Sequence, residues 1–181
     1  MTRTVYYTAT TLDGYIADEH DSLEWLFTHD VDQEGPGGYE PFIAGIGAMA
    51  MGATTYEWVR AHLSRTGEPW PYDLPCWVLT HRELPAVAEG VRFASGDVRE
   101  HHAAMVEAAG DRGVWVVGGG DLAGQFADVG LLDQVMISIA PVTLGAGRPL
   151  FPRRYDLSLV ETARNGDFVV ATYDVVGARS D

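Results

Sequence analysis

The sequence predicts an α/β protein with a mixed, mostly parallel central sheet, helices on both faces of that sheet and an antiparallel hairpin at the C-terminal end. Two observations lead to this fold class. Short apolar segments rich in β-branched residues alternate with segments of helical periodicity as far as residue 140, which is typical of β-α-β units. Beyond them, Asn165-Gly166 separates two further strand-like segments, and Asn-Gly is the strongest short signal for a hairpin.

Length and composition fit a single globular domain over residues 1–181. Hydrophobic residues make up 46% of the chain, but no apolar run reaches the roughly 20 residues that cross a bilayer. The single cysteine, Cys76, excludes an intrachain disulfide, and the N-terminus lacks a signal-peptide pattern, so we expect a cytoplasmic protein. The net charge of -14 repels a phosphate backbone, so we expect neither a nucleic-acid nor a membrane partner.

The first third of the chain predicts one strand and a long connection. Residues 5–10 are rich in β-branched and aromatic residues and form the expected strand. The polar stretch that follows extends to about Pro41, and connections of this length are usually lids or binding loops. We expect short helices within it around residues 23–28 and over residues 39–44, the second ending near Gly45 and Gly47.

The middle of the chain predicts two β-α units. Residues 48–51 form a short buried strand closed by Gly52, and the next helix has Thr54 or Thr55 as its cap. Residues 64–75 contain several prolines and are expected to be irregular. The remaining elements of this part are strands over 77–79 and 91–93 and a helix that begins with the capping box Asp97–Glu100 and ends at Gly110.

The last third predicts a buried strand, a glycine turn, a helix and three more strands. The apolar strand covers residues 114–117, and the helix after the glycines ends at Gly130. The later strands are expected over 134–140, 157–163 and 168–176.

The turn Val117-Gly118-Gly119-Gly120-Asp121-Leu122 is the strongest functional signal. A strand that runs through glycines into a helix leaves the first-turn amides free at the positive end of the helix dipole, where a diphosphate binds. A structural turn with glycines needed only for their backbone conformation is the alternative. A Rossmann site is excluded because the following strand ends at Ala140 without an acidic residue, and no Gly-Lys-Ser/Thr sequence indicates a Walker loop.

Two other strand ends carry groups that bind anions. Thr80, His81 and Arg82 follow one strand, and an arginine there suits the 2′-phosphate of NADP. Gly52 with Thr54 and Thr55 forms a second strand–glycine–helix junction. The histidines form no metal-binding spacing, so no metal site is expected.

Together these segments resemble the dihydrofolate reductase superfamily, specifically stand-alone proteins similar to the C-terminal reductase domain of the bifunctional riboflavin-biosynthesis deaminase-reductase. The resemblance extends over nearly the whole chain. The segments that carry it are 11–17, 22–26, Met51-Gly52 with Thr55-Tyr56-Glu57, 79–82, 117–120, and Ala140-Pro141-Val142 leading to 147–152.

The resemblance implies a three-layer α/β/α fold, NADPH as cofactor and a homodimer. Ala9 and Ile16 would contact the nicotinamide amide, and the two glycine junctions would hold the phosphates. Thr80, His81 and Arg82 would surround the adenosine and its 2′-phosphate. Relatives often carry arginine where this chain has Ala53, so the preference for NADP depends mainly on His81 and Arg82.

The implied reaction is hydride transfer to a heterocycle of the dihydrofolate or 5-amino-6-(5-phosphoribosylamino)uracil type. In the first long connection, Asp30 corresponds to the catalytic acid, and Asp13 and Trp25 are the candidate substrate contacts. The alternative is a sensor or scaffold that binds NADP(H) without catalysis.

Overall fold

A computed structural model describes residues 1–180. The larger sheet contains eight strands in the order β5-β4-β3-β6-β1-β7-β10-β9. The strands from β5 to β7 are parallel, and β10 and β9 are antiparallel to their neighbours. The elements are β1 (Thr4–Thr11), β2 (Tyr15–Ala17), η1 (Glu24–Thr28), α1 (Tyr39–Ala44), β3 (Ile46–Gly52), α2 (Ala53–Thr66), β4 (Cys76–Leu79), β5 (Val91–Ala94), α3 (Val98–Ala109), β6 (Gly113–Gly118), α4 (Gly120–Asp128), β7 (Gln134–Ala140), β8 (Arg148–Pro149), β9 (Tyr155–Asn165) and β10 (Phe168–Ala178).

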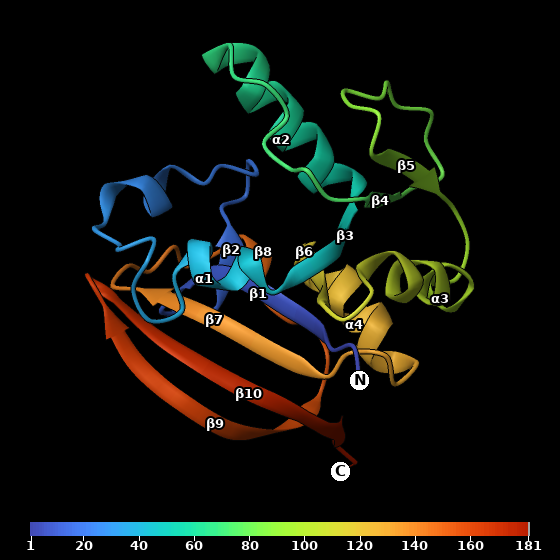
Figure 1. Cartoon of the computed structure of the whole chain (residues 1–181). Coiled ribbons are helices and arrows are strands. Elements are labelled where there is room, and N and C mark those ends of the chain that lie inside the picture. The colour runs from blue at the N-terminus through green and yellow to red at the C-terminus, as the bar shows by residue number, and fades with distance from the viewer. Residues whose placement is uncertain (181) are drawn as a thin grey trace.

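Helices cover both faces of the parallel part of this sheet (Figure 1). Side chains of β3 alternate between two apolar clusters, because successive residues of a strand point to opposite faces. Ala48 and Ala50 pack in the cluster that α3 and α4 cover, whereas Met49 and Met51 pack in the cluster that contains Tyr56 of α2. The predicted fold class, a mixed sheet with a C-terminal antiparallel hairpin, is confirmed.

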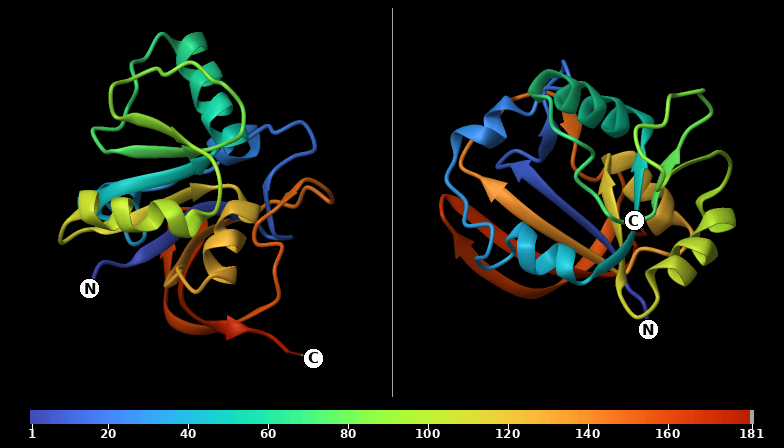
Figure 2. Two further views of the ribbon diagram at one scale, coloured as in Figure 1. Left: turned by 90° about the vertical axis from the view of Figure 1, so that its right-hand side faces the viewer. Right: turned by 45° about the horizontal axis from the view of Figure 1, so that its top comes forward.

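The hairpin β9-β10 extends beyond the helices, and its outer strand lies at the edge of the sheet (Figure 2). Most residues of β9 are exposed. The helices therefore cover the parallel strands and part of β10, which α4 contacts, but not the outer strand β9.

The Asn-Gly signal located the hairpin but misplaced its turn by one residue. Asn165 pairs with Phe168, so Gly166 and Asp167 form the turn, and Gly166 has a φ of 58°. Asn165 is buried and donates hydrogen bonds to the carbonyl oxygens of Asp32 and Pro36. Its side chain therefore anchors the first long connection to the sheet.

Two boundaries in the middle of the chain also differ from the prediction. The helix α2 continues to Thr66, so the first residues of the 64–75 segment are helical. The strand β3 begins at Ile46 and includes Gly47, where an added Cβ would lie 2.4 Å from the carbonyl oxygen of Ala109. Gly47 thus permits α3 to pack closely on β3 and does not terminate α1.

Candidate functional site

A cavity of about 590 Å³ opens at the edge of the sheet where β3 and β6 end. Ligands bind at this edge of open α/β sheets, and the volume is in the range of cofactor sites. The strand β1 contributes to the opening because it pairs with β6 only from Thr4 to Tyr6. Beyond Tyr6 the side of β1 that faced β6 carries no strand, and Thr8 lines the cavity there.

The glycine turn forms one wall of this cavity. Gly119 caps α4 without a side-chain hydrogen bond, so the amides of the first turn keep their donor capacity. The peptide bond between Gly118 and Gly119 is cis. A Cβ added at Gly119 would lie 3.8 Å from Ile16, whereas a Cβ at Gly120 would lie 2.4 Å from two carbonyl oxygens of the 149–150 segment. Gly119 therefore leaves space for a ligand, and Gly120 leaves space for the protein's own backbone.

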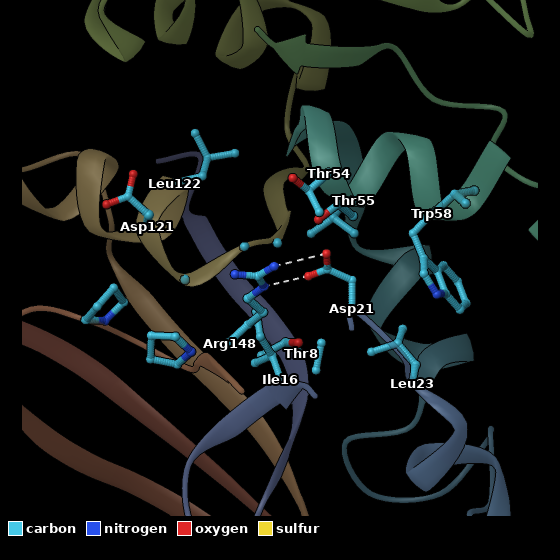
Figure 3. Close-up of a pocket in the computed structure, with 18 of the residues that line it drawn as sticks. Thr8, Ile16, Asp21, Leu23, Thr54, Thr55, Trp58, Asp121, Leu122 and Arg148 are labelled. Carbon is cyan, nitrogen blue, oxygen red and sulfur yellow. Dashed lines mark hydrogen bonds and ion pairs between the residues drawn. The ribbon is translucent and has the colours of Figure 1, made fainter. Parts of the chain in front are cut away.

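The start of α2 forms the facing wall. Gly52 caps this helix, and no side chain supplies a capping bond, so the prediction that Thr54 or Thr55 is the cap is wrong. Both threonines line the cavity instead, within the first turn of the helix. A Cβ added at Gly52 would meet only the carbonyl oxygen of Gly118, at 3.9 Å. The cavity thus lies between two helix N-termini that present uncapped amides (Figure 3).

A two-stranded sheet closes the side of the cavity opposite the helices. The strands β2 and β8 pair in antiparallel fashion, and Leu150 donates a backbone hydrogen bond to Gly14 at 2.9 Å. Gly147 has a φ of 149° and lies so close to β2 that an added Cβ would be 2.2 Å from the oxygen of Ala17. This close approach ties the first long connection to the 147–150 segment.

Aromatic side chains line the remaining wall. Trp58, Tyr72 and Trp115 face the cavity, and the indole of Trp115 donates to the carbonyl oxygen of Tyr7 at 3.0 Å. Burial raises the pKa of Tyr72, so its phenol stays protonated through the physiological range. Flat apolar walls of this kind suit a planar heterocycle.

Both carboxylates that line the cavity are bound to arginines. Hydrogen bonds from Gln125 and then from Arg153 lower the pKa of Asp121, so its carboxylate is charged at neutral pH. Asp21 forms a two-point ion pair with Arg148. Both side chains thus already have an arginine as partner.

The model of the RibD C-terminal domain family matches residues 73–167, from the approach to β4 to the turn of the hairpin. That segment is just over half of the 181-residue chain. The chain belongs to the RibD C-terminal domain family.

Individual proteins and solved structures are also similar to this chain. The "Uncharacterized protein YwjB" of Bacillus subtilis is 33% identical over 82% of this chain and 82% of its own length. A crystal structure of a "Putative riboflavin biosynthesis protein" from Shewanella sp. PV-4 superposes with a TM-score of 0.80 at 26% identity, over 97% of this chain and 99% of that one. The deaminase/5-amino-6-(5-phosphoribosylamino)uracil reductase of Thermotoga maritima shares the fold, with a TM-score of 0.68 at 17% identity over 97% of this chain and 57% of that one.

The structure brings most of the expected cofactor residues of this family member to the cavity. Both glycine junctions and the start of the first long connection contribute. The expected residues that line it are Ile16, Thr54, Thr55, Val117, Gly118, Gly119, Gly120, Asp121 and Leu122.

The other expected cofactor residues lie outside the cavity lining. Thr80, His81 and Arg82 follow β4, whose last residue, Leu79, pairs with Gly52, so they share the edge of the sheet with the cavity. Arg82 is exposed and forms an ion pair with Glu57 at 2.6 Å. Ala9 lies on β1, one residue beyond Thr8, and Gly52 ends β3 as the cap of α2, next to the lining residues Thr54 and Thr55.

The three residues expected to serve the substrate or the proton also lie outside the lining. The carboxylate of Asp13 accepts hydrogen bonds from Thr11 and from the amides of Leu144 and Gly145, which lower its pKa. Asp30 is exposed and its backbone is bonded to Asp167, beside the hairpin turn. The positions of Asp13 and Asp30 do not support direct roles of these two carboxylates in the chemistry.

Trp25 differs from these two acids because it is buried. It packs with Ala140 and Phe168, and Ala9 lies against the same cluster. Its indole nitrogen has no hydrogen-bond partner among the described residues. A buried donor without a partner is a site for a polar ligand atom or water.

Sequence reasoning missed several residues of the lining, above all Arg148, Asp21, Trp58 and Tyr72. Arg148 stands in the Gly147-Arg148-Pro149 segment that carries part of the family resemblance, which was the available signal. Nothing in the local sequence connects Asp21 to it. In residues 1–180 no cluster of histidine, cysteine and acidic side chains has the geometry to hold a metal. Within the same residues no helix has both the length and the apolar character needed to span a membrane.

Proposed function

We propose that this chain is an NADPH-dependent reductase of a pterin-like or pyrimidine-like heterocycle, of the dihydrofolate or 5-amino-6-(5-phosphoribosylamino)uracil type. One observation carries the proposal. The uncapped N-termini of α2 and α4 face one cavity. Gly52 and Gly119 cap these helices, and an added Cβ at either glycine would meet little. Amides at helix starts bind phosphate through their hydrogens and through the helix dipole, so the pair suits a diphosphate.

The residues at this edge of the sheet would divide the diphosphate and the nicotinamide of NADPH between them. Thr54 and Thr55 with Asp121 and Leu122 would hold the diphosphate, and backbone groups of Ile16 and Ala9 would orient the carboxamide. The open side of β1 beyond Tyr6 supports the role of Ala9. Bound NADPH would supply the hydride, while the protein contributes orientation and a cavity with little water.

The preference for NADPH over NADH would come from Arg82 and His81. Both follow β4 at the same edge of the sheet and both are exposed. A guanidinium binds phosphate oxygens through two parallel hydrogen bonds, and only NADPH carries the 2′-phosphate.

The substrate would bind over the aromatic wall and extend toward Ala9, where the indole N–H of Trp25 would donate to one of its polar atoms. Since Asp21 and Asp121 are both bound to arginines and Asp30 lies elsewhere, we propose that water delivers the proton. The side chains then serve to position the heterocycle and to restrict access of solvent.

Calorimetric titration with NADPH and NADH, followed by steady-state assays with both named substrates, tests the proposal. We expect NADPH to bind in the micromolar range and one heterocycle to be reduced. Tight NADPH binding without reduction of any heterocycle in a broad panel would favour the non-catalytic sensor or scaffold. Absence of binding by both nucleotides at millimolar concentration would refute the proposal.

We further propose that the chain is a homodimer formed through the β9-β10 hairpin. Five aliphatic side chains on this hairpin are more than a third exposed, and exposed apolar surface of this kind would be buried in an isologous interface between two subunits. They are Leu157, Leu159, Val160, Val169 and Val176.

A further inference from the structure

Arg148 is the one cation among the described residues that line the cavity. It belongs to β8, where its backbone pairs with Ala17 of β2. Its guanidinium lies in the middle of the cavity, with Thr55 and Asp21 on one side and Asp121 and Leu122 on the other (Figure 3). A positive charge at this position faces the same space as the amides of both helix N-termini.

Asp21 occupies the binding face of this guanidinium. The Nε atom of Arg148 donates to Oδ1 of Asp21 at 2.6 Å, and a terminal nitrogen donates to Oδ2 at 3.1 Å. A phosphate would use the same fork geometry, with two oxygens on two parallel donors. The carboxylate is therefore an internal substitute for a phosphate.

The turn that presents Asp21 is built for this contact. Asp21 is the one non-glycine residue of the described chain with a left-handed backbone, at a φ of 61°. The carboxylate of Asp18 accepts hydrogen bonds from the amides of His20 and Ser22, both at 2.8 Å, and so holds the turn on either side of Asp21. Aspartate tolerates this backbone conformation better than most residues.

We propose that Arg148 is the phosphate anchor of the cavity and that a phosphate-bearing ligand displaces Asp21 from it. The inference rests on the proposed function, because it assigns a residue to the same site. Without the exchange, an incoming phosphate meets the charges of Asp21 and Asp121 in a protein of net charge -14. With it, the guanidinium adds its two hydrogen bonds to those of the helix amides.

The exchange also changes how the first long connection is held. The 18–22 turn contacts Arg148 through the carboxylate of Asp21, whereas the β2-β8 pairing uses backbone atoms only. Ligand binding therefore frees the 18–22 turn and leaves β2 in place. The phosphate can be the diphosphate of the nucleotide or the phosphate of a phosphorylated substrate.

Calorimetric titration of NADPH into four proteins tests this exchange: wild type, Asp21→Asn, Arg148→Met and the double variant. Removing an ionic competitor worth as much as an exposed ion pair should tighten binding about 2- to 5-fold in Asp21→Asn. Arg148→Met should weaken binding about 10-fold or more, because a charge-assisted hydrogen bond is lost. In the Arg148→Met background, Asp21→Asn should tighten binding less than in wild type, because only the repulsion between Asp21 and the phosphate remains to be removed.

Asp156→Asn is the matched control, since Asp156 also pairs with an arginine, Arg179, but on the hairpin. It should leave the affinity unchanged. Arg148→Lys, which keeps the charge and loses the fork, should lie between wild type and Arg148→Met and replaces the latter if that variant does not fold.

Opposite results would overturn the proposal. If Asp21→Asn weakens NADPH binding, the ion pair is a latch that the bound state needs. If Asp21→Asn tightens binding equally in the Arg148→Met background, the effect is one of net charge. Titration of ribose 5-phosphate into NADPH-saturated protein identifies the source of the phosphate. If both substitutions change the affinity for ribose 5-phosphate but not the affinity for NADPH, Arg148 binds a substrate phosphate.

A failure of the proposed function is distinguishable from a failure of the exchange. If wild type binds neither nucleotide, the same variants are titrated with inorganic pyrophosphate. Tightening by Asp21→Asn and loss by Arg148→Met would then support a phosphate anchor in a protein that is not a nicotinamide-dependent reductase. Binding of NADPH with no response to either substitution would refute the exchange alone.

Discussion

The two ends of the large sheet differ in what they expose. At the parallel end, β3, β6 and β1 are covered by helices and their carboxyl edge forms a cavity with ion pairs and helix N-termini. At the antiparallel end, β9 and β10 carry exposed aliphatic side chains and no helix covers the outer strand. Parallel connections return each strand through a helix and so collect helix starts at one edge, which a hairpin does not do. We infer that ligand binding belongs to the first end and assembly to the second.

The largest effect that this comparison predicts is that of Gly120→Ala at the parallel end. Its Cβ would lie 2.4 Å from carbonyl oxygens of both Pro149 and Leu150, so backbone must move. We expect the free energy of unfolding to fall by about 3 kcal/mol, as for severe overpacking, and NADPH binding to be lost as the 148–150 segment shifts. Urea denaturation and calorimetry measure both effects.

Gly52→Ala is the control for that substitution. The added Cβ would meet only one atom, at 3.9 Å, so stability should change by less than about 0.5 kcal/mol. If both variants are equally unstable, the space available for a Cβ does not explain the role of Gly120.

At the antiparallel end, Leu159→Lys should dissociate the proposed dimer without altering the cavity. Leu159 is 58% exposed in the single chain, so the monomer loses little. A lysine ammonium buried in an isologous interface meets its own copy and should weaken association about 100-fold, as uncompensated interface charges do. Light scattering after size exclusion gives the mass.

Leu12→Lys provides the comparison, because Leu12 is 70% exposed near the cavity end. It should leave the mass unchanged. A monomeric wild type, or a dimer that survives Leu159→Lys, would remove the assembly role from the hairpin.

Arg82→Ala should lower the affinity for NADPH much more than the affinity for NADH. We expect NADPH affinity to fall about 10-fold and NADH affinity to stay within about 2-fold, because only NADPH offers a phosphate to the guanidinium. The equivalent change at the hairpin, Arg179→Ala, should affect neither. Equal weakening of both cofactors would exclude a role in binding the 2′-phosphate.

The smallest effect is expected for Asp30→Asn. Asp30 lies beside the hairpin turn and outside the cavity lining, and its backbone is bonded to Asp167. The kcat and its pH profile should therefore match wild type. A loss of activity that is restored at low pH would return Asp30 to the role of proton donor.

Local pattern was sufficient for the main helices and strands and for the glycine turn, but not for the short strands β2 and β8. Residues 48–51 were readable as a buried strand because all four are apolar and Gly52 follows them, and the structure places Ala48 and Ala50 on one face and Met49 and Met51 on the other. The uncapped start of α4 was also readable, since glycines after an apolar strand leave no side chain to cap the helix. Such features depend on residues within a few positions of each other.

The sequence by itself thus determined the fold class, the main helices and strands and the glycine turn that is proposed to bind phosphate. Only the tertiary structure decided which glycine gives room to a ligand, Gly119, and which to the chain, Gly120. It also brought Asp21 to Arg148 across 127 positions of sequence. The physical reason is that these contacts depend on the order of strands in the sheet and on the pairing of β2 with β8, and neither leaves a period or a local signature in the sequence.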